Sequence, residues 1–248
     1  MSNYPRIVIA GLGGDSGKTI LSCGLLAHFR EKEYAIAPFK KGPDYIDPAW
    51  LRLSARTTVR NLDTYLMGEE TVVQSFKTHA YGKDISIIEG NRGLYDGFDV
   101  QGTHSTATLA KIIDAPVILI INARKVTRTL AAIVLGCKEM DKDLNIAGIV
   151  LNQVAGKRHA KIAKESIEET TGIPVIGILP KHGEADIMPS RHLGLITPDE
   201  YKTAEEGIEK AKNLIQQHVD LQKLLKIANN SSELQFKLDN KFLNKEKG

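Results

Sequence analysis

Short apolar runs rich in valine and isoleucine recur along the chain, and segments with helical spacing separate them. Both faces of nearly every run are apolar, as expected for parallel strands that helices cover on both sides. Six runs predict strands, over residues 6–10, 34–39, 85–88, 116–121, 146–151 and 175–179. The main helical segments lie over residues 18–30, 105–113, 126–140, 159–171 and 203–217. This alternation predicts an α/β fold: a doubly wound, mainly parallel sheet with helices on both faces.

Two parts of the chain depart from this alternation. Residues 42–82 form a longer connection than usual, with helical stretches around 50–55 and 69–79. Long insertions of this kind are often functional. From about residue 220 the chain becomes rich in Lys, Asn and Glu. We therefore expect one domain over residues 1–218 and a polar tail or linker over residues 219–248.

The composition narrows the class of protein. The chain has 248 residues, 42% hydrophobic and 25% charged, and can bury a core of ordinary size. Its net charge of +3 is too small to indicate a nucleic-acid surface, although it suits anionic small molecules. With neither a signal peptide nor a bilayer-spanning apolar segment, a cytoplasmic protein is expected. Cys23 and Cys137 lie in apolar helical contexts and are expected in the core.

A glycine-rich turn follows the first predicted strand. It reads Gly-Leu-Gly-Gly-Asp-Ser-Gly-Lys-Thr over residues 11–19, and a helix begins at Lys18. Backbone N–H groups of such a turn and the N-terminus of its helix bind phosphate. Lys18 is expected at the β- and γ-phosphates and the Thr19 hydroxyl at Mg²⁺. Leu12 replaces the first glycine of the strict P-loop pattern. The sequence therefore predicts a variant P-loop that binds ATP through Gly13, Gly14, Asp15, Ser16, Gly17, Lys18 and Thr19.

Acidic residues follow two further strands at the same edge of the predicted sheet. Glu89 comes directly after one strand, and Asp44 and Asp47 follow another, within Lys-Lys-Gly-Pro-Asp-Tyr-Ile-Asp-Pro over residues 40–48. A carboxylate at the place of Glu89 suits Mg²⁺ or its waters. The two lysines, two acids, glycine and prolines of residues 40–48 suit a fixed polar loop at a phosphate site. The alternatives are a solvent-facing acid for Glu89 and turn chemistry for the two aspartates.

Three glycines surround Arg92 and Asp96 in the loop of residues 90–97, which is typical of a loop that approaches a ligand closely. Ser105 and Thr106 open a helix and serve either as N-caps or as donors to a carboxylate. Asn152 ends a strand and either reads adenine through its amide or forms a turn.

Taken together, these motifs resemble the synthetase domain of the cobyrinic acid a,c-diamide synthases, relatives of dethiobiotin synthase. Residues 11–19 are similar to the variant P-loop of that group, and residues 39–48 to its most specific stretch. Glu89-Gly90 with residues 93–97 is similar to its second loop. Residues 105–111, 152 and 191–195 extend the likeness, which covers roughly residues 5–218.

The resemblance implies an ATP-dependent amide ligase that acts on a tetrapyrrole carboxylate. ATP phosphorylates the carboxylate, and ammonia then displaces phosphate from the acyl phosphate. The implied catalytic residues are Lys18, Lys40, Asp44, Glu89 and Asp96, with Lys41 as the alternative to Lys40. The implied Mg²⁺ ligands are Thr19, Asp44 and Glu89, while Asn152 and Pro180 border adenine. The implied substrate side comprises Tyr45, Ile46, Arg92, Tyr95, Asp96, Ser105 and Thr106.

The chain departs from the family in two ways. It stops where full-length members begin a glutaminase domain with a nucleophilic cysteine. We therefore expect either a fragment of a longer enzyme, or ammonia supplied by solvent or by a separate glutaminase. Asn91-Arg92 replaces an apolar pair, and the arginine suits an extra substrate carboxylate. Siroheme or nickel-sirohydrochlorin amidation therefore stays open beside a corrinoid substrate.

Two other functions also stay open. One is a dethiobiotin synthase-like ligase, against which residues 42–48 argue. The other is a partitioning-type nucleotide-switch ATPase, which carries a second lysine where this chain has Leu12 and Gly13. No nucleic-acid or membrane partner is expected, and the oligomeric state is open, a homodimer included.

Overall fold

The computed structural model of the chain describes residues 4–182, 187, 190–191, 194–195, 198, 203–231 and 234. Its main sheet has seven strands in the order β3-β2-β4-β1-β5-β6-β7, and all neighbouring pairs are parallel. The strands are β1 (Arg6–Gly11), β2 (Ile36–Lys41), β3 (Arg60–Leu62), β4 (Ile85–Glu89), β5 (Val117–Asn122), β6 (Ile146–Val154) and β7 (Val175–Pro180). Because all strands run the same way, the loops that follow them gather at one edge, called here the carboxyl edge.

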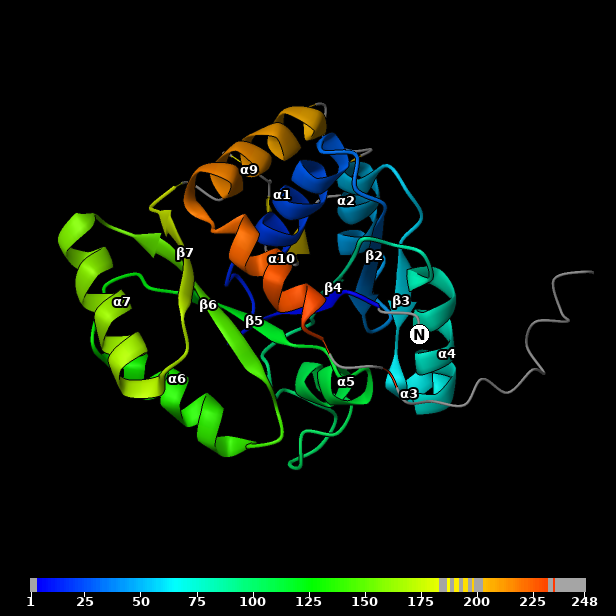
Figure 1. Ribbon diagram of the computed structural model, residues 1–248, viewed down its shortest axis with the longest axis horizontal. Helices are drawn as coiled ribbons and strands as arrows, with labels where there is room; N and C mark the ends of the chain where they lie inside the picture. Colours follow the sequence, from blue (N-terminus) through cyan, green and yellow to red (C-terminus); the bar gives the residue numbers. More distant parts are fainter. Residues whose placement is uncertain are drawn as a thin grey trace, which may run out of the picture.

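The two faces of the sheet carry separate cores, which the alternation of side chains along β1 illustrates. Ile7 and Ile9 point into one core, and Val8 and Ala10 point into the other. Figure 1 shows the first core under α1 (Lys18–Glu31), α2 (Ile46–Ala55), α9 (Ala204–His218) and α10 (Leu221–Asn229). The second lies under α4 (Glu69–Ala80), α5 (Thr106–Ile112), α6 (Thr129–Met140) and α7 (Lys157–Thr171).

These elements confirm the predicted fold class, an α/β fold with helices on both faces of a doubly wound parallel sheet. All six predicted strands exist, with ends that differ by up to three residues. The insertion over residues 42–82 also contains β3 and the short helix α3 (Thr64–Met67), which the sequence did not predict. Within the described residues, no helix has both the length and the apolar character required to cross a bilayer.

Part of the segment expected to be a polar tail is helical in the structure, since residues 221–229 form α10. Leu224 and Ala228 of this helix are fully buried in the core below α1 and α9. After the helix, the Ser231 hydroxyl donates to the backbone oxygens of Tyr4 and Ala228. We therefore propose that the folded domain runs through α10 and does not end at residue 218.

A small second sheet pairs β8 (Ser190–Arg191) with β9 (Gly194–Leu195) in antiparallel fashion. It falls within the stretch 191–195 that carries part of the family resemblance. His192 and Leu193 of that stretch lie outside the described residues.

Candidate functional site

The P-loop connects β1 to α1 at the middle of the carboxyl edge. Its last residue before the helix, Gly17, has φ 98°, a left-handed backbone conformation that favours glycine. A Cβ at Gly17 would lie 2.5 Å from the Nδ2 atom of Asn152, so the loop is closely packed there. A Cβ at Gly13 or Gly14 would meet no atom within 4 Å, which leaves the outer side of the loop open for a ligand.

Lys18 and Thr19 begin α1 and point to different parts of the site. The Lys18 ammonium group donates to the Gly13 carbonyl at 2.7 Å, and so folds back over the loop. Burial lowers the pKa of Lys18, and the negative charge of Glu89 opposes that shift. The Thr19 hydroxyl donates to the Oε1 atom of Glu89 at 2.9 Å, which joins the P-loop to the end of β4.

A buried lysine, Lys40 at the end of β2, lies at the centre of an acidic cluster. Its Nζ atom lies 2.5 Å from Asp47, 3.0 Å from Glu89 and 3.8 Å from Asp44. Burial by itself lowers the pKa of Lys40, but Glu89 and Asp47 outweigh it and raise that pKa above its usual value. Lys40 is therefore a fixed cation between residues that come from β4 and from the start of α2.

The same cluster has an excess of negative charge. Burial raises the pKa of Asp44, and the charge of Asp47 raises it further. Burial also raises the pKa of Asp47, and the charge of Glu89 adds to that shift. The second carboxylate oxygen of Glu89 is buried without a hydrogen-bond partner. A divalent cation at this oxygen would relieve both the repulsion and the missing contact, so the residues fit Mg²⁺.

Few protein ligands are available for such an ion. Among the described residues, no group of three or more His, Cys, Asp and Glu side chains is spaced to hold a metal ion. Mg²⁺ is usually held by one or two carboxylates together with phosphate oxygens and water. Glu89, with the neighbouring Thr19 hydroxyl, is suited to that shared arrangement. Asp44 lies beside them, and one of its oxygens accepts from the Ile46 N–H.

The second loop, residues 90–97, lies directly against the P-loop. A Cβ at Gly93 would approach the Leu12 carbonyl to 2.7 Å and the Asp96 carboxylate to 2.5 Å. Only glycine fits this contact, and the Gly93 N–H donates to Asp96 at 2.9 Å. The structure thus brings Asp96, an exposed carboxylate, next to the phosphate loop, while its substrate-side role stays a prediction from the family resemblance.

The other expected substrate residues divide into two groups. Tyr45 is 77% exposed and Arg92 is exposed, so both side chains are accessible near the carboxyl edge. The Tyr95 hydroxyl instead donates to the Cys137 carbonyl in α6. Ser105 caps α5 by accepting from the Thr108 N–H. Thr106 is buried, and its hydroxyl binds the backbone of Asn91, so it braces the second loop.

Asn152 has a role that the sequence did not indicate. It is buried in β6, and its Nδ2 atom donates to the Ser16 carbonyl at 3.1 Å. Its Oδ1 atom accepts from the Gln153 N–H. One end of the side chain therefore holds the P-loop and the other binds its own strand, while the amide keeps a second N–H and a second acceptor site for a ligand. Pro180 ends β7 nearby, where its carbonyl lies 2.9 Å from the His182 Nδ1 atom.

Sequence reasoning noted Asp47 as part of a polar loop but gave it no role. In the structure it contacts Lys40 more closely than Asp44 does, because it begins the first turn of α2, which turns back toward β2. The sequence did offer a signal for this contact: Asp47 is an acidic residue in the first turn of a helix that follows the lysine-bearing strand β2.

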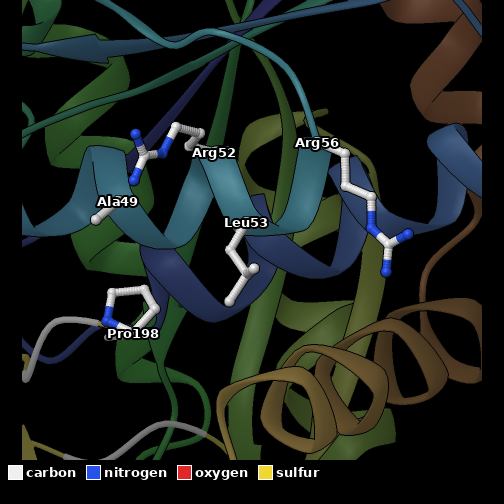
Figure 2. Close-up of a pocket in the computed structure, with 5 residues that line it drawn as sticks. All are labelled: Ala49, Arg52, Leu53, Arg56 and Pro198. Atoms are coloured by element: carbon white, nitrogen blue, oxygen red, sulfur yellow. The ribbon is translucent and has the colours of Figure 1, made fainter. Parts of the chain in front are cut away.

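A surface hollow lies outside this site, on α2. It has a volume of about 190 Å³ and is lined by Ala49, Arg52, Leu53, Arg56 and Pro198. Figure 2 shows the two arginine side chains pointing in different directions, and Arg56 lies 3.7 Å from Glu205 of α9. The two arginines therefore do not converge on one anion, and the hollow has no part in the site around Lys18.

The strand, glycine-rich turn and helix, together with the acid at the end of β4, define a P-loop nucleotide-binding α/β domain. Residues 7–196 match the model of the CbiA family, described as the CobQ/CobB/MinD/ParA nucleotide binding domain. The chain belongs to this family.

Curated relatives make the likeness more specific. The chain is 40% identical to the cobyrinate a,c-diamide synthase of Magnetococcus marinus, over 93% of this chain and 49% of that protein. It is 44% identical to the cobyrinate a,c-diamide synthase of Methanobrevibacter smithii, over 92% of this chain and 51% of that protein. The resemblance inferred from the motifs is confirmed, and the chain spans about half the length of the curated relatives it matches.

Solved structures agree on the fold. A nucleotide-binding protein in complex with ADP from Archaeoglobus fulgidus superimposes with a TM-score of 0.52 at 12% identity, over 84% of this chain and 87% of that one. Chloroplast FtsY from Physcomitrella patens gives a TM-score of 0.53 at 13% identity, over 85% and 66% of the two chains.

Proposed function

We propose that this chain is the ATP-dependent synthetase part of an amide ligase that converts a tetrapyrrole side-chain carboxylate into an amide. The observation that carries the proposal is the junction of the P-loop with the buried Lys40 cluster, made by the bond from Thr19 to Glu89. This junction places a fixed cation beside the phosphate loop, where a phosphoryl group is transferred. Relatives of this sequence at about 40% identity are cobyrinate a,c-diamide synthases.

The proposed reaction has two steps. A substrate carboxylate oxygen attacks the γ-phosphorus of ATP, forming an acyl phosphate and releasing ADP. Ammonia then attacks the acyl carbon, the carbon–oxygen bond to phosphate breaks, and the nitrogen loses a proton. The first step needs charge neutralisation more than covalent help from the protein.

Each residue of the junction has a proposed part in the first step. Lys18 and the backbone N–H groups of residues 13–17 bind the phosphates. Lys40 stabilises negative charge on the phosphoryl group as it transfers. Thr19, Glu89 and Asp44 would hold Mg²⁺, which neutralises phosphate charge when bound.

The substrate side of the proposal rests on three accessible residues. Tyr45 with the neighbouring Ile46 is suited to contact the macrocycle, and Asp96 lies where ammonia would approach the acyl phosphate. Arg92 is a cation that makes no ion pair with another described residue, and it is suited to a further substrate carboxylate. This arginine favours a sirohydrochlorin-type macrocycle as the second candidate substrate. We propose a cytoplasmic location and ammonia from solvent or a separate glutaminase.

Product analysis tests the function. Purified protein is given ATP, Mg²⁺ and ammonium with cobyrinic acid, sirohydrochlorin or nickel-sirohydrochlorin, and the products are weighed by mass spectrometry. The expected product is lighter than its substrate by about one mass unit per amide formed, because NH₂ replaces OH, with one ADP released for each amide. Incorporation of carbon dioxide into a diamine would identify a dethiobiotin synthase-like ligase instead. ATP turnover that ignores tetrapyrroles and needs a protein partner would identify a nucleotide switch.

A further inference from the structure

A group of exposed aromatic side chains lies at the carboxyl edge, outside the residues assigned so far. Tyr65 of α3 stacks on Phe98, with ring centroids 5.3 Å apart and ring planes 22° apart. His104 meets the edge of Tyr65 at 5.4 Å. Tyr65 is 61% exposed and Phe98 is 73% exposed. We call Tyr65, Phe98 and His104 the aromatic platform.

The platform is held in place by hydrogen bonds. The Asp63 carboxylate accepts from the Tyr65 N–H and caps α3, and the Thr64 hydroxyl lies 2.8 Å from His104 Nδ1. The Phe98 N–H donates to the Thr103 carbonyl at 2.8 Å. Exposed aromatic rings fixed in this way are a preorganised surface, since the protein loses little conformational freedom when a ligand stacks on them.

The platform belongs to the same rim as the P-loop. α3 follows β3, and the loop that carries Phe98 and His104 follows β4, whose last residue is Glu89. That loop contains Gly93, which packs against the Leu12 carbonyl of the P-loop. One continuous segment therefore runs from the phosphoryl-transfer cluster to the platform.

Two cations accompany the platform at the carboxyl edge. Lys41 ends β2 and pairs with Leu62 of β3, the residue before Asp63, whose side chain caps α3. The exposed Arg92 follows Asn91 in the second loop, and a Cβ at Gly42, next to Lys41, would lie 3.3 Å from the Asn91 side chain. Burial lowers the pKa of Lys41, Asp63 opposes this shift, and Arg92 adds to it, as expected for neighbours. A ligand with a broad apolar face and several peripheral carboxylates complements this combination of rings and cations.

We infer that the aromatic platform binds the face of the tetrapyrrole macrocycle, while Lys41 and Arg92 bind carboxylates that do not react. This inference rests on the proposed function and specifies how its site selects a substrate. A second copy of the chain or another protein is a different occupant of the same rings, which the experiment separates from the macrocycle.

Equilibrium binding tests the inference without catalysis. Cobyrinic acid and sirohydrochlorin are titrated into the protein by absorption spectroscopy, in the absence of ATP and ammonium. Tyr65→Ala and Phe98→Ala are expected to raise Kd by roughly 3- to 10-fold each, in line with the usual worth of one stacked aromatic ring. Tyr65→Phe keeps the ring and is expected to bind as wild type. Tyr81→Ala is the matched control, because Tyr81 is 68% exposed but lies just before β4, at the opposite edge of the sheet.

The outcomes separate the inference from the proposed function. If the wild type forms amide but Tyr65→Ala and Phe98→Ala leave both Kd and KM unchanged, the platform is not the macrocycle site and the proposed function stands. If the variants lose binding but the wild type forms no amide, the platform stands and the function fails. A change in sedimentation behaviour with unchanged Kd would assign the rings to a contact between protein chains and overturn the inference.

Discussion

At the scale of single residues, the site depends on a balance of buried charges. Lys40 is surrounded by Asp44, Asp47 and Glu89, so its removal would leave the fully buried Glu89 carboxylate without this cation, which costs more than the pair itself stabilises. The predicted strands place Lys40, Asp44 and Glu89 at the carboxyl edge, and the family resemblance implies their roles. It could not give the bond from Asn152 to Ser16, since 136 positions separate the partners and only the fold brings them together.

Lys18→Ala tests the residue on which the P-loop assignment depends. The variant is expected to lose ATP turnover by roughly 10²- to 10³-fold, because it lacks the cation that neutralises the transferring phosphate. The fold should persist, since among the described residues the hydrogen bonds of the side chain go to the loop oxygens of Gly13 and Ser16. Turnover is measured as ADP release and the fold by circular dichroism, with Lys161→Ala on the surface of α7 as the control. If Lys18→Ala keeps near-native ATP turnover and an unchanged circular dichroism spectrum, the assignment of residues 11–19 as a P-loop is wrong.

Tyr95→Phe tests a pH dependence of stability. Burial raises the pKa of Tyr95 from 10.0 to about 12, and the charges of the neighbouring Cys137 and Asp141 add to this shift. A raised tyrosine pKa adds stability that is complete below pH 10 and is lost as the pH rises toward about 12. Removal of the hydroxyl is expected to cost about 0.5–1.5 kcal/mol at pH 7 through the lost bond to Cys137.

The measurement for Tyr95 is urea unfolding at pH 7 and at intervals between about pH 10 and 12, the range that the shift defines. The difference in unfolding free energy between wild type and Tyr95→Phe should shrink across that range. Tyr81→Phe, an exposed tyrosine, is the control. A constant difference at every pH would show that the Tyr95 hydroxyl titrates equally in folded and unfolded protein.

At the scale of elements, the pattern of apolar residues predicted the long buried strands and helices well, but it predicted short or partly polar elements poorly. β5, with five of its six residues buried, is easily recognised as a parallel strand. β3 has only three residues and depends on pairing with β2, so no periodicity reveals it. The α10 segment mixes apolar residues with lysines and lies in a stretch rich in Lys, Asn and Glu, which hid its apolar stripe, although Leu224 and Ala228 stand four residues apart.

Leu224→Ala tests whether α10 is part of the domain. Leu224 is fully buried, so its truncation is expected to cost about 2–5 kcal/mol of unfolding free energy through lost burial and a cavity. Gln222→Ala, at an exposed position of the same helix, should change stability by less than about 0.5 kcal/mol. Chemical denaturation measures both. If Leu224→Ala and the wild type are equally stable, α10 does not contribute to the folded domain, and the domain ends near residue 218 as the sequence predicted.

At the scale of the whole molecule, a parallel sheet gathers residues that are far apart in the chain. The P-loop, the Lys40 cluster, the second loop and the aromatic platform all follow the carboxyl ends of β1, β2, β3 and β4. The sequence predicted this convergence from strand direction alone. It could not predict the platform, because Tyr65 follows the strand β3 that no pattern reveals, and Phe98 meets it only in the folded chain.

The proposed source of nitrogen is also a question about the whole molecule. Release of ammonia from glutamine needs an activated nucleophile, usually a cysteine thiolate with a histidine partner. Burial raises the pKa of Cys23 well above its usual value, and burial also raises the pKa of Cys137. Neither thiol therefore forms an appreciable thiolate near pH 7, and neither bonds to a histidine among the described residues.

This polypeptide alone is therefore expected to form amide from ammonium and not from glutamine. Ammonia would reach the acyl phosphate near Asp96, the exposed carboxylate beside the P-loop. The measurement supplies protein, ATP, Mg²⁺ and tetrapyrrole with either nitrogen source and compares amide formation by mass spectrometry. Cys137→Ala, the less buried cysteine, should keep the ammonium rate if that thiol only fills space. Amide formed from glutamine at the ammonium rate, with no other protein present, would reveal a glutaminase site that neither cysteine explains.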